Sequence, residues 1–201
     1  MIHRNRLLVA ATMAACLFVG SQALGQFQSQ TLPVGFATTD GSNDTAFPFN
    51  TTDDQIWQWH YPASDFLAGS EILITDLSVR APDGLSAIAA FSVSDLEITL
   101  IEASTAVGVH DPVFANNVRR QAVVRRGLFA GTGVPASGRP TADWLSLRLQ
   151  GRFLYDPSTG NDLIIQVRKC GPTVPFLTNV DGEFGTAVRA GHRTDCNAAS
   201  L

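Results

Sequence analysis

The sequence predicts an all-β fold: a single antiparallel β-sandwich of jelly-roll type with Greek-key connections. Along several short segments, apolar and polar residues alternate with a period of two, which is typical of strands that bury one face. Clusters of Gly, Pro, Asn and Asp separate these segments. No stretch of about a dozen residues keeps the apolar spacing of a helix, so we expect many short strands joined by tight turns.

Residues 1–25 have the three parts of a secretory signal peptide. Two arginines precede an apolar run over residues 7–20, and the small residues Ala23 and Gly25 precede a cleavage site at Gln26. The run is shorter than the ~20 residues that cross a bilayer. We therefore expect a chain that is cleaved near Gly25-Gln26 and exported to the periplasm or the extracellular space, with no transmembrane segment in its mature part.

Cys16 supports a second interpretation of the N-terminus. The three residues before it are similar to the box that precedes the lipidated cysteine of bacterial lipoproteins. Cleavage there would make an acylated Cys16 the first residue of a membrane-anchored protein. The mature chain would then begin with the apolar residues 17–19.

Charge and length restrict the partners and the number of domains. The chain has 201 residues, 16% of them charged, and a formal net charge of −4. Removing the signal peptide removes two arginines and no acidic residue, which changes the net charge from −4 to −6. Such an acidic chain argues against a nucleic-acid partner. The length predicts one domain over residues 26–201, with an irregular end from about Ala190.

Cys170 and Cys196 are the two cysteines that remain after cleavage. In an oxidising compartment an isolated pair usually forms a disulfide. Closing this loop of about 27 residues would stabilise the fold by roughly 3–4 kcal/mol in the chain-entropy description. A metal site is the weaker interpretation, because no Cys-x-x-Cys motif or histidine cluster accompanies the pair.

The short alternating segments are the predicted strands. In chain order they are residues 55–61, 71–80, 93–102, 121–124, 127–130, 143–153, 162–168 and 184–189. In residues 55–61, three aromatic residues recur at every second position, so they share one strand face. Residues 71–80 carry apolar side chains on both faces, which indicates a strand without a clearly exposed side.

Three segments predict most clearly which side chains are buried. Their apolar positions are Leu96, Ile98 and Leu100 in residues 93–102; Leu145, Leu147, Leu149 and Phe153 in residues 143–153; and Leu163, Ile165 and Val167 in residues 162–168. The positions between them are mostly polar or charged, with Trp144 an exception. We expect the apolar set to form the core and the intervening set to face solvent.

A series of short strings suggests a family. The strings are LPVGFAT at residues 32–38, FPF at 47–49, FA at 114–115 and FLYDP at 153–157, followed by Asp162. In their order the chain resembles a group of uncharacterised secreted bacterial β-proteins, many of which end in a PEP-CTERM sorting tail. The resemblance implies an exported β-sandwich and implies no activity. Residues 172–201 hold no apolar span like that of a sorting tail, so we expect free release or a longer native chain.

Trp57, Trp59 and Tyr61 are the candidate ligand-binding residues. A row of aromatic rings on an exposed strand face can stack on the apolar faces of sugars, while the ring edges offer hydrogen bonds. A polysaccharide or a cell-surface glycan is therefore the expected partner. The alternative is that these side chains line the core.

Asp95 and Glu97 are the candidate catalytic residues of a polysaccharide hydrolase. Two positions apart on a strand they are separated by roughly 6.6–7 Å, which lies within the range of ~5–9.5 Å for glycosidase carboxylate pairs. The alternative is a solvated strand face, since a catalytic pair usually comes from different elements that flank a cleft.

Asp40, Ser42 and Asp44 place oxygen-bearing side chains at alternate positions. Such oxygens can hold a hard cation such as Ca²⁺, although the twelve-residue loop pattern of EF-hands is absent. The alternative is an ordinary turn in which Asp and Asn side chains bond to the backbone. We therefore expect no cofactor, with Ca²⁺ as the possible exception.

The remaining polar groups form no recognisable motif. The arginine pairs 119–120 and 125–126 could meet an anionic polysaccharide or discourage pairing at a sheet edge. The histidines His60, His110 and His192 have no metal-site spacing, and no nucleophile-elbow or phosphate-loop motif is present. The sequence thus favours a secreted, non-enzymatic protein that binds carbohydrate or extracellular matrix. The alternatives are a jelly-roll polysaccharide hydrolase and a purely structural extracellular protein.

Overall fold

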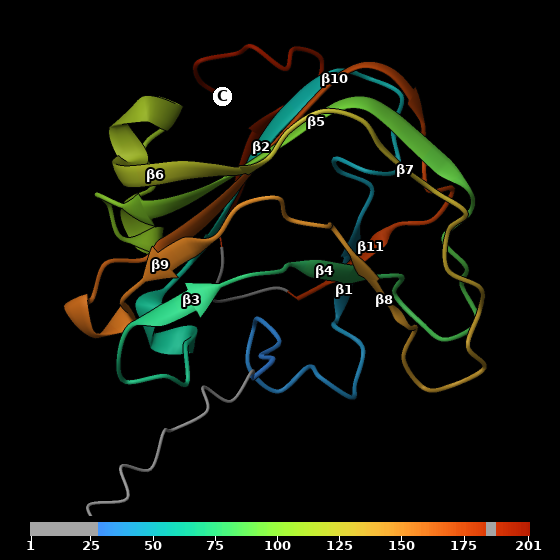
Figure 1. The fold of residues 1–201 in the computed structure, drawn as a ribbon, viewed down its shortest axis with the longest axis horizontal. Helices are drawn as coiled ribbons and strands as arrows, with labels where there is room; N and C mark the ends of the chain where they lie inside the picture. Colours follow the sequence, from blue (N-terminus) through green and yellow to red (C-terminus); the bar gives the residue numbers. More distant parts are fainter. Residues whose placement is uncertain (1–27, 184–187) are drawn as a thin grey trace, which may run out of the picture.

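The structure, a computed structural model, describes residues 28–183 and 188–201. The predicted signal peptide, its cleavage site and Cys16 lie outside the described residues. Antiparallel strands form two facing layers (Figure 1), so the prediction of an all-β sandwich is confirmed.

The larger layer is a six-stranded sheet. Its strands lie in the order β12 (Val188–His192), β2 (Gln55–Tyr61), β10 (Leu163–Val174), β5 (Phe91–Ala103) and β6 (Val118–Arg125), and β7 (Phe129–Gly131) also pairs with β5. Because β5 is 13 residues long, β6 and β7 pair with different parts of it. β2 lies inside this sheet, so its backbone is paired with β12 on one side and with β10 on the other.

The smaller layer consists of three two-stranded ladders. They are β1 (Asn43–Thr45) with β11 (Val180–Gly182), β3 (Ile72–Ile74) with β9 (Phe153–Tyr155), and β4 (Ser78–Arg80) with β8 (Trp144–Ser146). In chain order, β1 pairs with β11, β2 with β10, β3 with β9, β4 with β8 and β5 with β7, so the strand pairs are nested one inside the next. This is the connectivity of a rolled-up hairpin, as the jelly-roll prediction requires.

Helical structure is confined to short 3-10 turns in the described part of the chain. They are η1 (Ala63–Asp65), η2 (Val107–Val109), η3 (Phe114–Asn117) and η4 (Pro157–Thr159). None of these elements has the length and hydropathy that crossing a membrane would require. η4 follows the turn at Asp156, whose side chain accepts a hydrogen bond from the Ser158 N–H.

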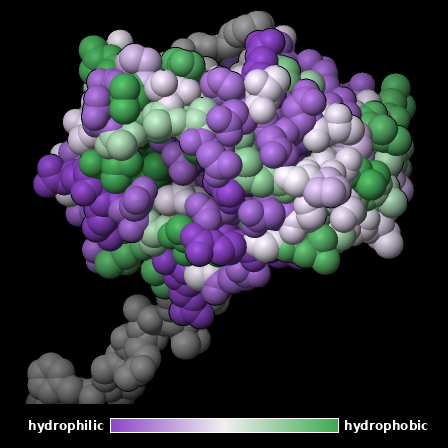
Figure 2. Space-filling model, turned by 90° about the horizontal axis from the view of Figure 1, so that it is seen from above, coloured by the Kyte–Doolittle hydropathy of each residue, from purple (hydrophilic) through white to green (hydrophobic). Residues whose placement is uncertain are grey.

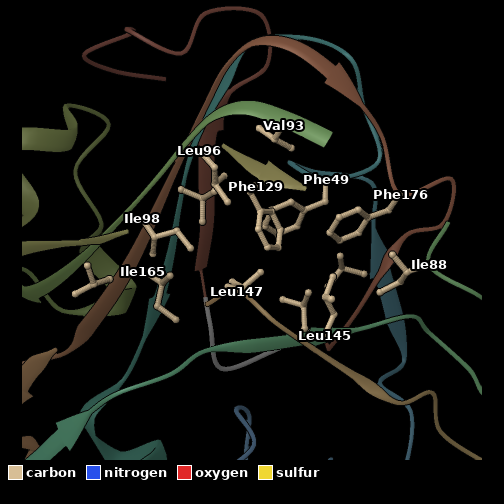
Figure 3. Close-up of a cluster of buried hydrophobic side chains, with 14 of the residues drawn as sticks. Phe49, Ile88, Val93, Leu96, Ile98, Phe129, Leu145, Leu147, Ile165 and Phe176 are labelled. Carbon is tan, nitrogen blue, oxygen red and sulfur yellow. The ribbon is translucent and has the colours of Figure 1, made fainter. Parts of the chain in front are cut away.

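The core lies between the two layers. Figure 3 shows Leu96, Ile98 and Ile165 of the larger layer directed toward Leu145 and Leu147, which come from the opposite side. Leu96 and Ile98 are fully buried, and Leu147 is 1% exposed. The apolar set predicted from the alternation is therefore buried between the two sheets, Leu149 only partly. The expectation that the intervening side chains face solvent is wrong for Thr99 and Asp162, which are 3% and 7% exposed.

A group of phenylalanines fills one end of this core (Figure 3). Phe49 stacks on Phe176 with ring centroids 4.9 Å apart, and Phe91 contacts both Phe129 and Phe176. Phe49 and Phe176 come from loops rather than strands. The alternation pattern could not identify them, because it applies only to strand residues.

Two strand predictions need correction. Residues 143–153 are not one strand: β8 ends at Ser146, β9 begins at Phe153, and Arg148 between them has a φ of 53°. A left-handed residue cannot continue a pleated strand, although Leu147 before it is buried and Leu149 after it is partly buried. Residues 71–80 likewise divide into β3 and β4, which pair with β9 and β8 respectively.

The C-terminal end is more regular than expected. β12 continues to His192, so the irregular part begins there and not at Ala190. Residues 184–187, where the predicted strand 184–189 begins, lie outside the described residues. Cys170 on β10 forms the predicted disulfide with Cys196, with Cα atoms 5.6 Å apart, and so joins the C-terminal segment to the centre of the larger sheet.

Candidate functional site

A cavity of about 340 Å³ is lined by both layers and by the N-terminal segment. We call it the aromatic cavity. Its lining comprises Trp59 and Tyr61 from β2; Asn43, Asp44 and Thr45 from β1; Ser78, Val79 and Arg80 from β4; Trp144 from β8; Val180, Asp181 and Gly182 from β11; and Thr31, Leu32, Pro33, Phe36, Gly41 and Glu183 from adjoining segments. Aromatic, acidic and basic side chains thus meet at one hollow in the sandwich.

Strand alternation explains which side chains the smaller layer contributes. Val79 on β4, Leu145 on β8 and Val180 on β11 all belong to the core. Side chains adjacent to these three along a strand point away from the core; they are Arg80, Trp144, Ser146 and Asp181. Arg80 and Trp144 are therefore brought together on the outer side of this layer, where the Arg80 guanidinium lies 4.7 Å from the centre of the Trp144 ring.

Arg80 makes several hydrogen bonds at the cavity. Its side chain is only 1% exposed. Its Nε and Nη2 atoms donate to Oδ2 of Asp181 at 2.8 and 2.6 Å, and further bonds reach the carbonyl oxygens of Ala37 and Thr39. One guanidinium therefore fastens β4 to β11 and to the N-terminal segment.

The three aromatic residues of β2 divide between two roles. Trp59 and Tyr61 are half-buried, pack against the core and line the aromatic cavity. Trp57 is only 4% exposed and does not line it. Its ring stacks on Phe47 with centroids 5.0 Å apart, and its Nε1 donates to Oε1 of Gln55. The Phe47 ring covers Trp57, so only Trp59 and Tyr61 of the predicted row line the cavity, and both are half-buried rather than exposed.

The side chains of the predicted cation site contact different partners and do not converge on one point. Ser42 donates from its N–H and its hydroxyl to Glu183, at 2.6 and 2.7 Å. Asp40 approaches Arg80 at 3.9 Å, and burial together with the charge of Asp181 raises the pKa of its carboxyl group. Asp44 is exposed on β1 at the cavity. In residues 28–183 and 188–201, no group of three or more His, Cys, Asp or Glu side chains is arranged to hold a metal ion.

Asp95 and Glu97 lie on the outer face of the larger sheet. Their carboxylates pair with arginines, Asp95 with Arg168 at 3.1 Å and Glu97 with Arg126 at 2.7 Å. Neither residue lines the aromatic cavity. Figure 2 shows the molecule from above, with hydrophilic residues dominating the centre of that face. The structure therefore brings this pair together as part of a charged strand surface.

The arginines of β6 bond within the protein. Arg119 and Arg120 both pair with Glu102, at 3.2 and 3.0 Å. Arg125 is 5% exposed and donates to two backbone carbonyls, while its guanidinium lies 4.7 Å from the centre of the Phe129 ring. Since β6 is the last strand of its sheet, the exposed Arg119 and Arg120 lie along a sheet edge, where charged side chains oppose pairing with another chain.

A buried polar network on the other face of β2 has no counterpart in the sequence analysis. His60 is fully buried, with its Nδ1 3.0 Å from Nδ1 of His110 and its Nε2 3.2 Å from the Asp162 carboxylate. Asp162 also accepts bonds from the N–H groups of Ala63 and Val107, both at 2.8 Å. The network thus fixes η1 and η2 against the end of the larger sheet.

Acidification is expected to destabilise the fold through this network. Burial lowers the pKa of His60 and of His110, although the Asp162 charge partly opposes the shift at His60. Below the ordinary histidine pKa of about 6.5, the unfolded chain then binds more protons than the folded chain, so the free energy of unfolding falls as pH falls. Urea denaturation between about pH 7 and pH 5 measures this fall. His60→Gln should reduce it and His192→Gln, outside the network, should not; an unchanged fall in His60→Gln would contradict the assignment.

A second cavity, of about 450 Å³, lies over the outer face of the larger sheet. It is lined by Ile56 and Gln166 of that face, by η3 and the start of β6, and by Ala198 and Ala199. Its lining contains no titratable side chain and no aromatic ring besides Phe114. It therefore offers little specific chemistry compared with the aromatic cavity.

Comparison of the chain with protein-family models, curated proteins and solved structures finds no match. The resemblance to secreted PEP-CTERM-type proteins therefore stays a prediction. Any function has to be argued from the geometry of the site, because a β-sandwich alone is compatible with many functions. Of the two cavities described above, the aromatic cavity is the one lined by both aromatic and charged side chains.

Proposed function

We propose that the protein is a secreted, non-enzymatic carbohydrate-binding protein, and that the aromatic cavity holds the sugar. The observation that carries the proposal is the convergence of Trp59, Tyr61 and Trp144 on one cavity that also contains carboxylates and a guanidinium. Pockets of about 300–1,000 Å³ with apolar walls and a few placed polar groups are the usual form of small-ligand sites.

The chemistry of these side chains suits a sugar. The faces of a sugar ring are apolar and can lie against indole or phenol rings, while its hydroxyls need hydrogen-bond partners. Burial, and secondarily the charge of Asp65, raises the pKa of Tyr61 to about 12. The phenol therefore keeps its proton near neutral pH, and a protonated phenol can donate a hydrogen bond to a hydroxyl oxygen.

Trp144 provides an exposed aromatic ring, which the buried Trp57 does not. It is 44% exposed, one of the large hydrophobic side chains that remain accessible. The Arg80 guanidinium supports its ring. An exposed indole held in place by a buried group is well suited to be a stacking surface, because binding then orders little that is mobile beforehand.

Two further observations bear on the wider proposal. The Cys170–Cys196 disulfide supports export, because disulfides persist in oxidising compartments. The arginine pairing of Asp95 and Glu97 on an outer strand face favours binding over the hydrolase alternative, since a general acid is typically desolvated within a cleft.

Changing Trp144 to Ala is expected to weaken retention on a glycan array by at least about tenfold, because the exposed stacking surface is lost. Leu128→Ala, which removes a side chain that is 66% exposed and lies outside the cavity, is the matched control. Circular dichroism and a urea midpoint establish that both variants fold. If the wild type is not retained on any glycan, or if Trp144→Ala is retained as well as the control, the proposed function is wrong.

A further inference from the structure

Residues 193–201 form a C-terminal segment that begins where β12 ends, and we call this segment the strap. In Figure 1 the strap runs over the larger sheet on the side away from the smaller layer. Ala198 and Ala199 of the strap line the second cavity together with Ile56 and Gln166 of the sheet. The strap is therefore one wall of that cavity.

The strap has little buried surface of its own. Cys196, at 2% exposed, is its one buried residue, and the structure describes every residue from 193 to 201. At its far end the Phe114 N–H donates to the Ala199 carbonyl at 3.0 Å. The Leu201 N–H donates to the Pro112 carbonyl, also at 3.0 Å, although Leu201 is 57% exposed. Segments with few buried contacts are the ones that open locally at low cost.

The side-chain contacts of the strap involve exposed residues. Gln55 Nε2 donates to the carbonyl of the exposed Arg193 at 3.1 Å, and the Arg193 guanidinium lies 4.8 Å from the centre of the Phe47 ring. Arg168 Nη2 donates to Oδ1 of the exposed Asn197 at 3.3 Å. Polar contacts that water can replace add little net stability. The attachment of the strap to the sheet therefore depends mainly on the covalent bond from Cys196 to Cys170.

The disulfide lies on the outer face of the larger sheet. Val167 of β10 belongs to the core between the layers, so Cys170, three positions further along the strand, lies on the opposite face. Cys170 is partly exposed, whereas Cys196 is buried. Attack by a thiolate from solvent is therefore expected at the Cys170 sulfur, and accessible disulfides are the more readily reduced ones.

A dithiol can open this bond in two exchange steps. Its first thiolate bonds to Cys170 Sγ, the bond between the two protein sulfurs breaks, and Cys196 leaves as a thiolate that takes up a proton. The second thiol of the reductant then displaces Cys170 from the mixed disulfide. The protein gains two electrons and two protons as a pair of thiols, and the dithiol is oxidised to its own disulfide.

We propose that the Cys170–Cys196 disulfide is a redox-sensitive latch: its reduction by a dithiol releases the strap and opens the second cavity, while the sandwich stays folded. Ile56 and Phe114, which are 7% and 4% exposed, line this cavity and become more exposed on release. The latch and the strap share no residue with the lining of the aromatic cavity, so the latch does not depend on the proposed carbohydrate function.

Amide hydrogen exchange, measured by NMR on the exported protein before and after complete reduction with dithiothreitol, tests the latch. The amides of Phe114 and Leu201, which hold the far end of the strap, are expected to exchange at least about tenfold faster after reduction. The amides of Leu100 and Ile165, paired in the centre of the larger sheet, should change by less than about twofold.

Two variants separate the disulfide from the other contacts. Cys170→Ala combined with Cys196→Ala removes the latch without a reductant and should reproduce the faster exchange. Alanine leaves no hydroxyl to bond the Asp54 carboxylate, which lies 3.7 Å from the Cys196 sulfur. Asn197→Ala removes the bond to Arg168 but keeps the disulfide, so it is the control and should exchange like the wild type.

Three results would overturn the latch. Unchanged exchange at Phe114 and Leu201, with thiol titration showing full reduction, means that the strap is held without the disulfide. Equal acceleration at Leu100 and Ile165, or a double alanine variant that does not fold, means that the disulfide holds the whole sandwich. Acceleration in Asn197→Ala as large as in the double variant means that hydrogen bonds, and not the disulfide, hold the strap.

Discussion

Changing Arg80 to methionine is expected to lower the free energy of unfolding by about 3–5 kcal/mol, because it leaves a buried carboxylate without its partner. The Arg80 side chain is 1% exposed and that of Asp181 is 8% exposed. Methionine fills part of the space but donates no hydrogen bond to Asp181 or to the Thr39 carbonyl. The change also removes the cation that lies over Trp144. Urea denaturation monitored by tryptophan fluorescence measures the loss.

Arg139→Met is the matched control for this prediction. Its ion pair with Asp143 is exposed on both sides, at 72% and 49%, so its loss should cost less than about 1 kcal/mol. A double variant that adds Asp181→Asn to Arg80→Met should be less unstable than the sum of the two single variants, since no unpaired charge is then buried. An Arg80→Met protein as stable as the control would show that this ion pair does not hold the smaller layer in place.

Changing Phe129 to alanine is the second large effect, with an expected loss of about 3–5 kcal/mol in the free energy of unfolding. Phe129 is fully buried, and its ring contacts Phe91 at 4.8 Å and Phe49 at 6.5 Å between centroids. Figure 3 places it at the centre of the apolar side chains between the layers. Its removal opens a cavity and also takes away the ring beneath the buried Arg125 guanidinium.

The neighbouring residue provides the comparison. Leu128 is 66% exposed, so Leu128→Ala should change stability by no more than about 0.5 kcal/mol. Such different losses of stability at adjacent positions would demonstrate that Phe129 of β7 points into the core and that Leu128, just before β7, points to solvent. Similar losses for Phe129→Ala and Leu128→Ala would contradict the position of β7 in the sandwich.

The period-two pattern predicted much of the fold, because burial between two sheets imposes it directly on the strands. Leu96, Ile98 and Leu100 alternate in the sequence, and all three are fully buried. Where the backbone departs from an ideal strand, the pattern still identified the buried residues but not the conformation. Leu145 and Leu147 are buried as predicted, while the left-handed Arg148 ends the strand that the pattern extended.

The candidate site was predicted only in part. Trp59 and Tyr61 were identified because they stand close together in the sequence, and Trp57 was grouped with them for the same reason. Trp144 had a signal of its own, an aromatic residue on the otherwise polar side of an alternating segment. Asp181 had none, since what makes it important is its ion pair with Arg80, which lies 101 positions away in the chain.

The sequence by itself determined that this protein is an all-β sandwich with one disulfide. A strand that buries one face needs alternating apolar and polar residues, and two isolated cysteines usually pair in an oxidising compartment, so both features can be read locally. Only the tertiary structure decided which side chains line the aromatic cavity. Nested pairing brings β1 beside β11 and β4 beside β8, so Arg80, Asp181 and Trp144 meet across three separate parts of the chain. Contacts of this kind depend on strand register and on the order of strands in a sheet, and neither can be predicted from the residues of a single segment.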